Sequence, residues 1–176
     1  ITGGGSDTLA FATAANAFSI SGSSTLSAAF KAAVTGFSTI ELAAIGANTV
    51  ALDVTKFAAA GTITQLNQTG NAAASALTVS NLPSGATIQV TGANTGASVT
   101  TAGTTGSGTS DTLNIALKDG SGGAVAFGTF ATPNVENINI VLSDTQATPV
   151  GYVNTATLTN AAAYSIKISG NSEISN

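Results

Sequence analysis

The chain of 176 residues carries four lysines, no arginine and eight carboxylates, which gives a net charge of −4. This balance argues against a nucleic-acid partner, because phosphate binding needs clustered Lys and Arg, and it equally disfavours an anionic membrane surface. The absence of Cys excludes disulfides and thiolate metal sites, and the absence of His removes the commonest general base and transition-metal ligand.

The supply of large apolar side chains is small. Apolar residues make up 43% of the chain, but only seven Phe and two Tyr are present, with no Trp or Met. Because buried apolar area stabilises a fold by roughly 25 cal/mol per Å², this supply favours an elongated protein with a narrow core. No apolar run reaches the roughly 18 residues of a membrane helix, and the many short Ile, Val and Leu segments argue against disorder of the whole chain.

The first predicted element is a glycine-rich turn, TGGGSDTLA, at residues 2–10. It matches the nonapeptide G-G-x-G-x-D-x-U-x, whose turns bind Ca²⁺, at Gly3, Gly5, Asp7 and Leu9. Glycine permits the tight turn that points carbonyl oxygens at an ion, and aspartate supplies charge. Ca²⁺ prefers six to eight oxygens, so one such turn is about half of a site. The alternative is a β-turn in which Asp7 bonds to its own backbone.

A short helix is predicted over residues 24–35. An apolar stripe that begins at Leu26 has the helical spacing. Ser24 or Thr25 can serve as its N-cap, and Gly36 can end it.

Asp53 lies within an otherwise strand-like segment, VALDVT, where a carboxylate needs a partner. Lys56 or a calcium ion would serve, and the alternative is a solvent-facing strand position. The segment that follows, VTKFAAAGTI, predicts a brief helical turn that ends at Gly61.

One short phrase recurs as FSISGSS, IQVTGAN and IKISGNS, beginning at Phe18, Ile88 and Ile166. Its alternation predicts a strand with one apolar face, and its glycine lets the backbone turn with φ > 0. A longer repeat contains the phrase. Three segments recur later in the same order in similar form: SDTLAF as SDTLNI, FSTIEL as VENINI, and ATIQVTGAN as YSIKISGNS. We therefore predict two related β-repeat units, residues 1–103 and 104–176, of which the first carries the helix.

The second copy of the calcium-type turn is GSGTSDTLN at residues 106–114. It keeps Gly106 and Asp111 of the nonapeptide and has a further glycine, Gly108. Asp144 in VLSDTQ is predicted as a strand-end Asx turn or a further ligand. Asp119 in LKDGSGG is predicted as an Asp-Gly hairpin or turn, and the three glutamates are expected at the surface.

The sequence contains no recognisable catalytic constellation. A serine hydrolase normally needs a base beside its nucleophile, and the chain has no His. A glycosidase needs two carboxylates, for which Asp53 and Asp144 would have to meet in one cleft. Sugar sites are usually lined with aromatic side chains, of which this chain has few, and we predict that the chain is not an enzyme.

The order of these motifs resembles that of RTX-type surface-layer (S-layer) proteins and giant RTX adhesins of Gram-negative bacteria. The resemblance is carried by GGGSDTL and GTSDTLNIAL, by the GFSTIEL and NVENINIVLSD segments that follow them, and by the I-x-V/I-S/T-G-N/S phrases. It implies type I secretion, folding on extracellular calcium and assembly into a lattice, with ligand roles for Asp7 and Asp111. The tandem nonapeptide runs of that family are absent here.

The fold that we predict is all-β, a right-handed parallel β-solenoid or β-roll with irregular rungs and one or two short helices. The alternative is an antiparallel β-sandwich module, because short alternating strands alone do not separate the two. The closing residues IKISGNSEISN retain the repeat character, which predicts a segment of a longer protein.

The predicted function is a structural segment of a secreted, self-assembling cell-surface protein that calcium folds and stabilises. Its expected partners are other copies, calcium and an outer-membrane glycan. The alternative is an adhesin module that recognises a glycan or a host surface protein, which an exposed cluster of Phe127, Phe130 and Tyr152 would favour. The candidate metal-binding positions are Gly3, Gly5, Asp7, Asp53, Gly106, Gly108, Asp111 and Asp144.

Overall fold

Two parallel β-sheets form most of the protein. The computed structural model describes residues 1–43, 45, 51–69, 76–93, 95–101, 110–146, 151–160, 163 and 165–175. Sheet A has the spatial order β1 (Thr2–Phe11), β2 (Thr35–Leu42), β4 (Gln65–Gln68), β6 (Thr87–Thr91), β8 (Thr112–Asp119), β10 (Asn137–Asp144) and β12 (Ser165–Gly170). Sheet B has the order β13 (Glu173–Ser175), β11 (Val153–Thr159), β9 (Ala126–Ala131), β7 (Gly96–Thr101), β5 (Leu77–Leu82) and β3 (Leu52–Asp53).

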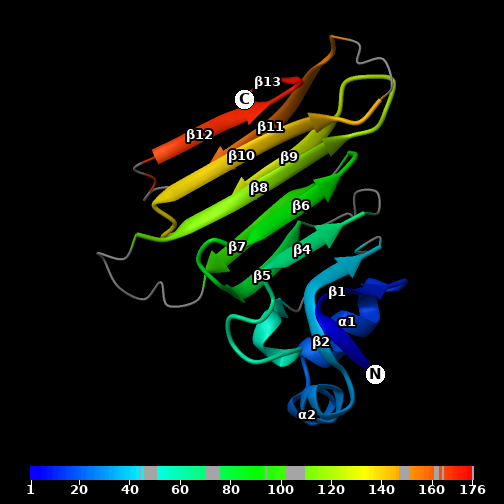
Figure 1. Ribbon diagram of the computed structural model, residues 1–176. Helices are drawn as coiled ribbons and strands as arrows, with labels where there is room; N and C mark the ends of the chain where they lie inside the picture. The colour runs from blue at the N-terminus through cyan, green and yellow to red at the C-terminus, as the bar shows by residue number, and fades with distance from the viewer. Residues whose placement is uncertain are drawn as a thin grey trace.

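Consecutive strands alternate between the two sheets from β2 onward, and from β4 onward each strand pairs in parallel with the strand two before it. Figure 1 shows the resulting stack, with the arrows of sheet A pointing one way and those of sheet B the other. The predicted parallel β-architecture is confirmed, and the antiparallel sandwich is wrong. Pairing continues across the predicted boundary at residue 103, since β6 pairs with β8 and β7 with β9.

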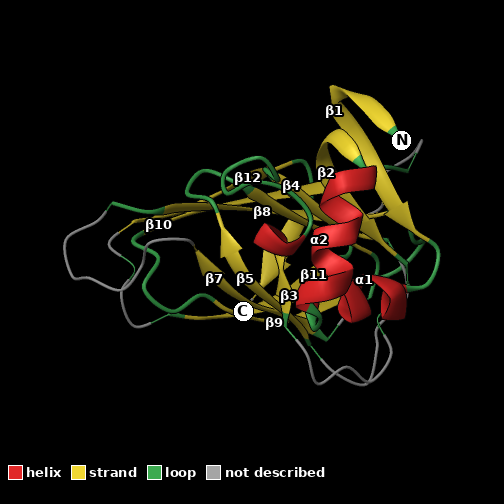
Figure 2. Cartoon of the chain, turned by 90° about the horizontal axis from the view of Figure 1, so that it is seen from below, coloured by secondary structure: helices red, strands yellow, loops and turns green. Residues whose placement is uncertain are grey.

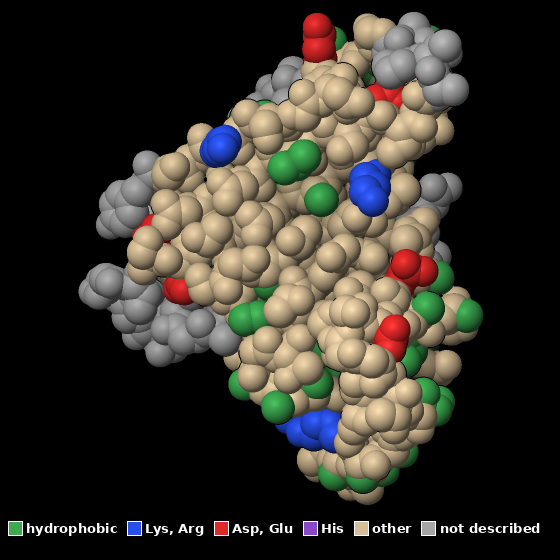
Figure 3. All heavy atoms as spheres, in the orientation of Figure 1, with side chains coloured by type: hydrophobic (Ala, Val, Ile, Leu, Met, Phe, Trp, Pro, Cys, Tyr) green, Lys and Arg blue, Asp and Glu red, His purple; other side chains and the backbone are tan. Residues whose placement is uncertain are grey.

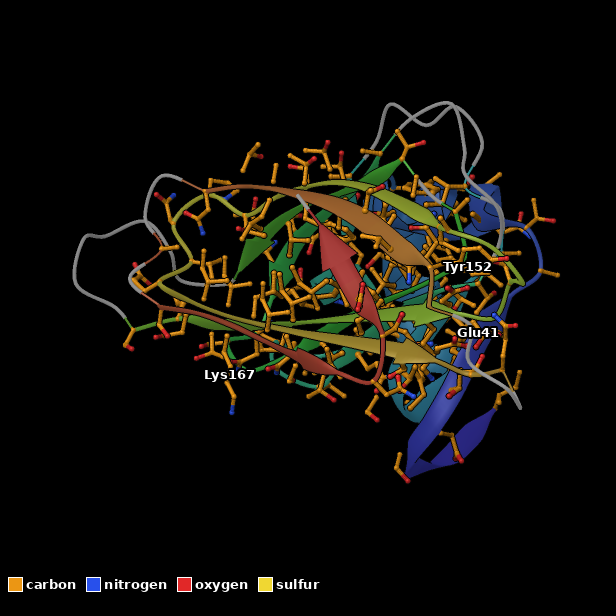
Figure 4. All side chains as sticks on the ribbon, turned by 90° about the horizontal axis from the view of Figure 1, so that it is seen from above. Glu41, Tyr152 and Lys167 are labelled. Atoms are coloured by element: carbon orange, nitrogen blue, oxygen red, sulfur yellow. The ribbon has the colours of Figure 1, made fainter. Side chains whose placement is uncertain are left out.

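The core lies between the sheets and consists of side chains in register from strand to strand. Along β8 and β10, buried residues alternate with half-buried or exposed ones, as period-two strands with one inward face require. Figure 4 looks down the stack and shows side chains filling the space between the sheets. One row of register partners in sheet A consists of the buried Ile40, Leu66, Ile88, Ile115 and Ile140 and ends at the exposed Ile168.

Two helices connect β1 to β2 along the chain: α1 (Ala14–Ser21) and α2 (Ser24–Ala33). Figure 2 views the molecule from the end of the stack that carries them. The helix predicted over 24–35 is therefore present as α2, but its N-cap is Ser23, whose hydroxyl accepts from the Leu26 N–H at 3.3 Å. The segment that was predicted to form a helical turn ending at Gly61 contains the 3₁₀ helix η1 (Val54–Lys56), which ends earlier than predicted.

The first FSISGSS phrase was expected to be a strand, and this prediction is wrong. Its residues from Phe18 to Ser21 belong to α1. Ala14, Ala17, Phe18 and Ser21 recur at helical spacing and are the buried residues of that helix. The alanines before Phe18 favour a helix, so the phrase takes a different structure here from the one in β6 and β12.

The edge of sheet B at β3 is covered by α1. The Ser21 hydroxyl donates to the Ala51 carbonyl at 2.7 Å and accepts from the Asp53 N–H at 2.8 Å. These bonds stand where a neighbouring strand would pair, which removes an exposed strand edge. At the other end, among the described strands, β12 and β13 each pair on one side only, and Ile166 and Ile168 are about half exposed. None of the described helices has the length and apolarity to span a membrane.

Candidate functional site

Asp7 closes its own turn within β1. Its carboxylate accepts a hydrogen bond from the Gly4 N–H, and its side chain is exposed. The pairing of β1 with β2 is irregular on both sides of Asp7, and Gly5 has φ +97°. Gly3, Gly5 and Asp7 therefore form one glycine-rich bulge at the edge of sheet A, and this geometry matches the turn alternative that we considered for Asp7.

Asp53 is half-buried at the end of β3 and caps η1. Its Oδ1 accepts from the Thr55 N–H at 3.0 Å, the Thr55 hydroxyl at 2.6 Å and the Asn81 amide at 2.9 Å. Burial acts to raise the pKa of Asp53, but the hydrogen bonds from Thr55 and Asn81, together with the charge of Lys56, outweigh it and lower the pKa below its ordinary 3.8. The main partners of this carboxylate are thus its hydrogen-bond donors, Thr55 and Asn81.

Asp111 and Glu136 are buried at the start of neighbouring strands of sheet A, with exposed fractions of 7% and 8%. They immediately precede Thr112 and Asn137, which are register partners in β8 and β10. The Asp111 N–H donates to Glu136 Oε2 at 2.9 Å. The expectation that Glu136 lies at the surface is wrong, because the register of β8 and β10 brings it beside Asp111.

Asp119 and Asp144 form a second acidic pair at the opposite ends of the same strands. They are register partners in β8 and β10, and only 2% and 8% of their surfaces are exposed. Each makes an Asx turn, in which Oδ1 accepts from the backbone N–H of Ser121 or Gln146 at 2.8 Å. The turn predicted at Asp119 is present, but it is not a hairpin, because β8 and its neighbours are parallel.

The described predicted ligands lie in four separate places, because Asp111 and Asp144 are at opposite ends of β8 and β10. The Asp7 turn is on β1, Asp53 is at the edge of sheet B, and Asp111 and Asp144 flank β8 and β10. Gly106 and Gly108 lie outside the described residues. Within the described part of the chain, no three carboxylates are close enough together to hold a metal ion. Each acidic pair could contribute oxygens to a cation only together with backbone carbonyls or water.

The aromatic cluster that would favour an adhesin does not form. Phe127 and Phe130 are core residues with exposed fractions of 0% and 2%, whereas Tyr152 is 40% exposed. Figure 4 shows Tyr152 at one end of the strands. No protein-family profile and no curated protein match this sequence.

Proposed function

We propose that the chain is a structural segment of a secreted, self-assembling cell-surface protein of the S-layer or RTX type. The observation that carries this proposal is the in-register stacking of parallel strands in two alternating sheets. Such a stack presents the same backbone spacing at every step and provides a long, regular body for a coat. Its proposed surroundings are extracellular, and its proposed partners are other copies of itself, calcium and an outer-membrane glycan.

The finer fold that we propose is a right-handed parallel β-solenoid in which two strands make one rung. Most of the side-chain hydrogen bonds between neighbouring strands join residues 25 to 29 positions apart, as in Asn139 to Asn114 and Val125 to Asn154, and the bond from Asn154 to Ser172 spans 18. This separation is the length of one full turn of such a coil. Right-handedness follows from the strong preference of crossovers between parallel strands.

Calcium is proposed to act at the two buried acidic pairs. Like charges directly opposite each other on neighbouring strands destabilise a sheet, and Asp119 and Asp144 are direct register partners. A cation that binds only the folded chain would offset this repulsion and stabilise the fold by mass action, by about 2.7 kcal/mol at a hundredfold excess over its dissociation constant. Among the predicted ligands, Asp111 and Asp144 belong to such pairs.

The experiment is a calcium titration of the chelated 176-residue chain, followed by circular dichroism and the thermal midpoint. We expect the midpoint to rise with calcium, and Asp144→Asn and Asp111→Asn each to reduce that rise. Asp7→Asn is the matched control, because Asp7 is exposed and bonds within its own turn, and it should respond to calcium as the parent chain does. A flat midpoint would remove the calcium role. Electron microscopy of the concentrated chain tests assembly separately, and a chain that stays dispersed would contradict the coat role.

A further inference from the structure

Two adjoining hollows lie between α2 and the segment 54–62. The first has a volume of about 430 Å³ and lies between the start of α2 and η1, with Ser24, Lys31 and Lys56 in its lining. The second, of about 220 Å³, extends beneath the end of α2 to Phe37 and Phe57. The two share the lining residues Lys31, Ala58 and Ala59.

The walls of these hollows are fixed by hydrogen bonds between α2 and η1. The Ser27 hydroxyl donates to the Lys56 carbonyl at 2.7 Å, and Lys31 Nζ donates to the Thr55 carbonyl at 3.3 Å. The fully buried Phe57 ring packs edge-on against Phe30, with ring centroids 5.6 Å apart. The site is thus held by packed elements at the end of the stack.

The electrostatic character of the hollows differs from that of the rest of the protein. Two of the four lysines line them, in a chain of net charge −4, and no Asp or Glu is among the described lining residues. Figure 3 shows a group of Lys side chains at the end that carries α2, apart from those on sheet A.

We propose that the two hollows form one binding site for a small amphipathic organic carboxylate. The carboxylate lies between the ammonium groups of Lys31 and Lys56, where opposite charges attract and each lysine can donate a hydrogen bond. The apolar body lies over Ala58 and Ala59 and reaches the second hollow, whose lining is mainly apolar. The first hollow lies within the size range of small-molecule sites. This site is independent of the proposed coat function.

The test compares three probes by calorimetry on the full chain at constant ionic strength. Hexanoate carries both the charge and the apolar body, acetate carries the charge alone, and hexanol carries the body alone. We expect hexanoate to bind with a dissociation constant of roughly 1 mM, and the other two at least about tenfold more weakly. Added salt should weaken hexanoate binding, because the lysines are partly solvent-exposed.

The chain provides its own matched controls. Lys31→Gln and Lys56→Gln should each weaken hexanoate binding about fivefold or more, whereas Lys118→Gln and Lys167→Gln remove the same charge from the outer face of sheet A and should leave it unchanged. Lys167 points away from the rest of the molecule in Figure 4. Circular dichroism checks that the variants are folded. Equal binding of hexanol, equal loss in the control variants, or no saturable binding of hexanoate would each overturn the proposal.

Discussion

Gln68 is a polar residue in an otherwise apolar row of the core. It is fully buried, and within the described structure its amide nitrogen and oxygen have no hydrogen-bond partner. Its register partners on the two sides are Leu42 and Val90, and Leu117 and Leu142 continue the row. A buried polar group without a partner costs about 1–3 kcal/mol, so this position is a weak point of the stack.

Gln68→Leu should therefore raise the free energy of unfolding by about 1–3 kcal/mol, because it removes the unpaired amide and fills the row with a side chain of similar volume. Urea unfolding measures this change. Gln65→Leu is the control, since Gln65 lies on the opposite face of the same strand and bonds to Asn67; it should bring no gain. A loss of stability in Gln68→Leu would mean that the amide is stabilising the native state.

Asp53 should make stability depend on pH. Because its pKa in the folded chain lies below the ordinary 3.8, the folded state favours the ionised carboxylate. The stabilisation is present above pH 3.8 and is lost as the pH falls through the lowered folded value. Unfolding measured from pH 6 to pH 2 should show a gap between the parent chain and Asp53→Asn that narrows in this acid range. A gap that stayed constant down to pH 2 would contradict the ionic role.

At the scale of elements, α1 acts as a cover for the edge of sheet B. The single hydroxyl of Ser21 satisfies a backbone carbonyl and a backbone N–H on either side of Leu52. Both groups are at the edge of the stack, where a lost partner cannot be replaced by another strand. A residue on the helix thereby decides how the sheet ends.

Ser21→Ala should lower the free energy of unfolding by about 1–3 kcal/mol, because it leaves both backbone groups without their partner. Hydrogen exchange should show faster exchange of the Asp53 amide in this variant. Ser19→Ala removes a hydroxyl that bonds only to Ala15 within the exposed face of the same helix, and it should change stability little. Unchanged Asp53 protection in Ser21→Ala would show that the cover does not depend on this bond.

The first residue of β7, Gly96, has to be glycine. Gly96 has φ +102°, and a Cβ there would lie 1.9 Å from the Thr129 carbonyl oxygen. Gly96→Ala should destabilise the chain by about 2–4 kcal/mol, since it combines backbone strain with a clash against β9. Thermal unfolding checks this, with Gly122→Ala as the control, because a Cβ at Gly122 meets open space. Equal midpoints for the two variants would show that β7 and β9 can move apart.

At the scale of the whole molecule, the elements that could be predicted from the sequence are those whose apolar residues recur at a regular short spacing. The two-residue alternation around Ile88 and Ile166 correctly indicated strands β6 and β12, and the stripe from Leu26 indicated α2. The phrase at Phe18 shares that alternation, yet it is helical. As part of α1 it packs against β3, α2, β1 and η1, and this packing buries Phe18 and Ser21. A short phrase is therefore insufficient where tertiary packing selects the conformation.

The acidic pairs could not be predicted in the same way. Asp111 and Glu136 are 25 residues apart, and only the register of β8 and β10 makes them neighbours. A shift of one residue in that register would place one member of the pair on the other face of the sheet. Sequence located Asp111 and Asp144 as candidates, but their partners Glu136 and Asp119 depend on the length of each turn of the chain.

The helix-covered end has a consequence for the direction of folding. Four of the seven phenylalanines, Phe11, Phe30, Phe37 and Phe57, form one set of contacting rings there. Each strand in the stack contacts mainly its immediate neighbours. The free energy of unfolding of each part therefore depends mainly on the strands next to it, as in a one-dimensional array. Native-state exchange should thus be slowest near the rings and progressively faster toward β12. Local unfolding would therefore begin at β12 and reach the aromatic end last.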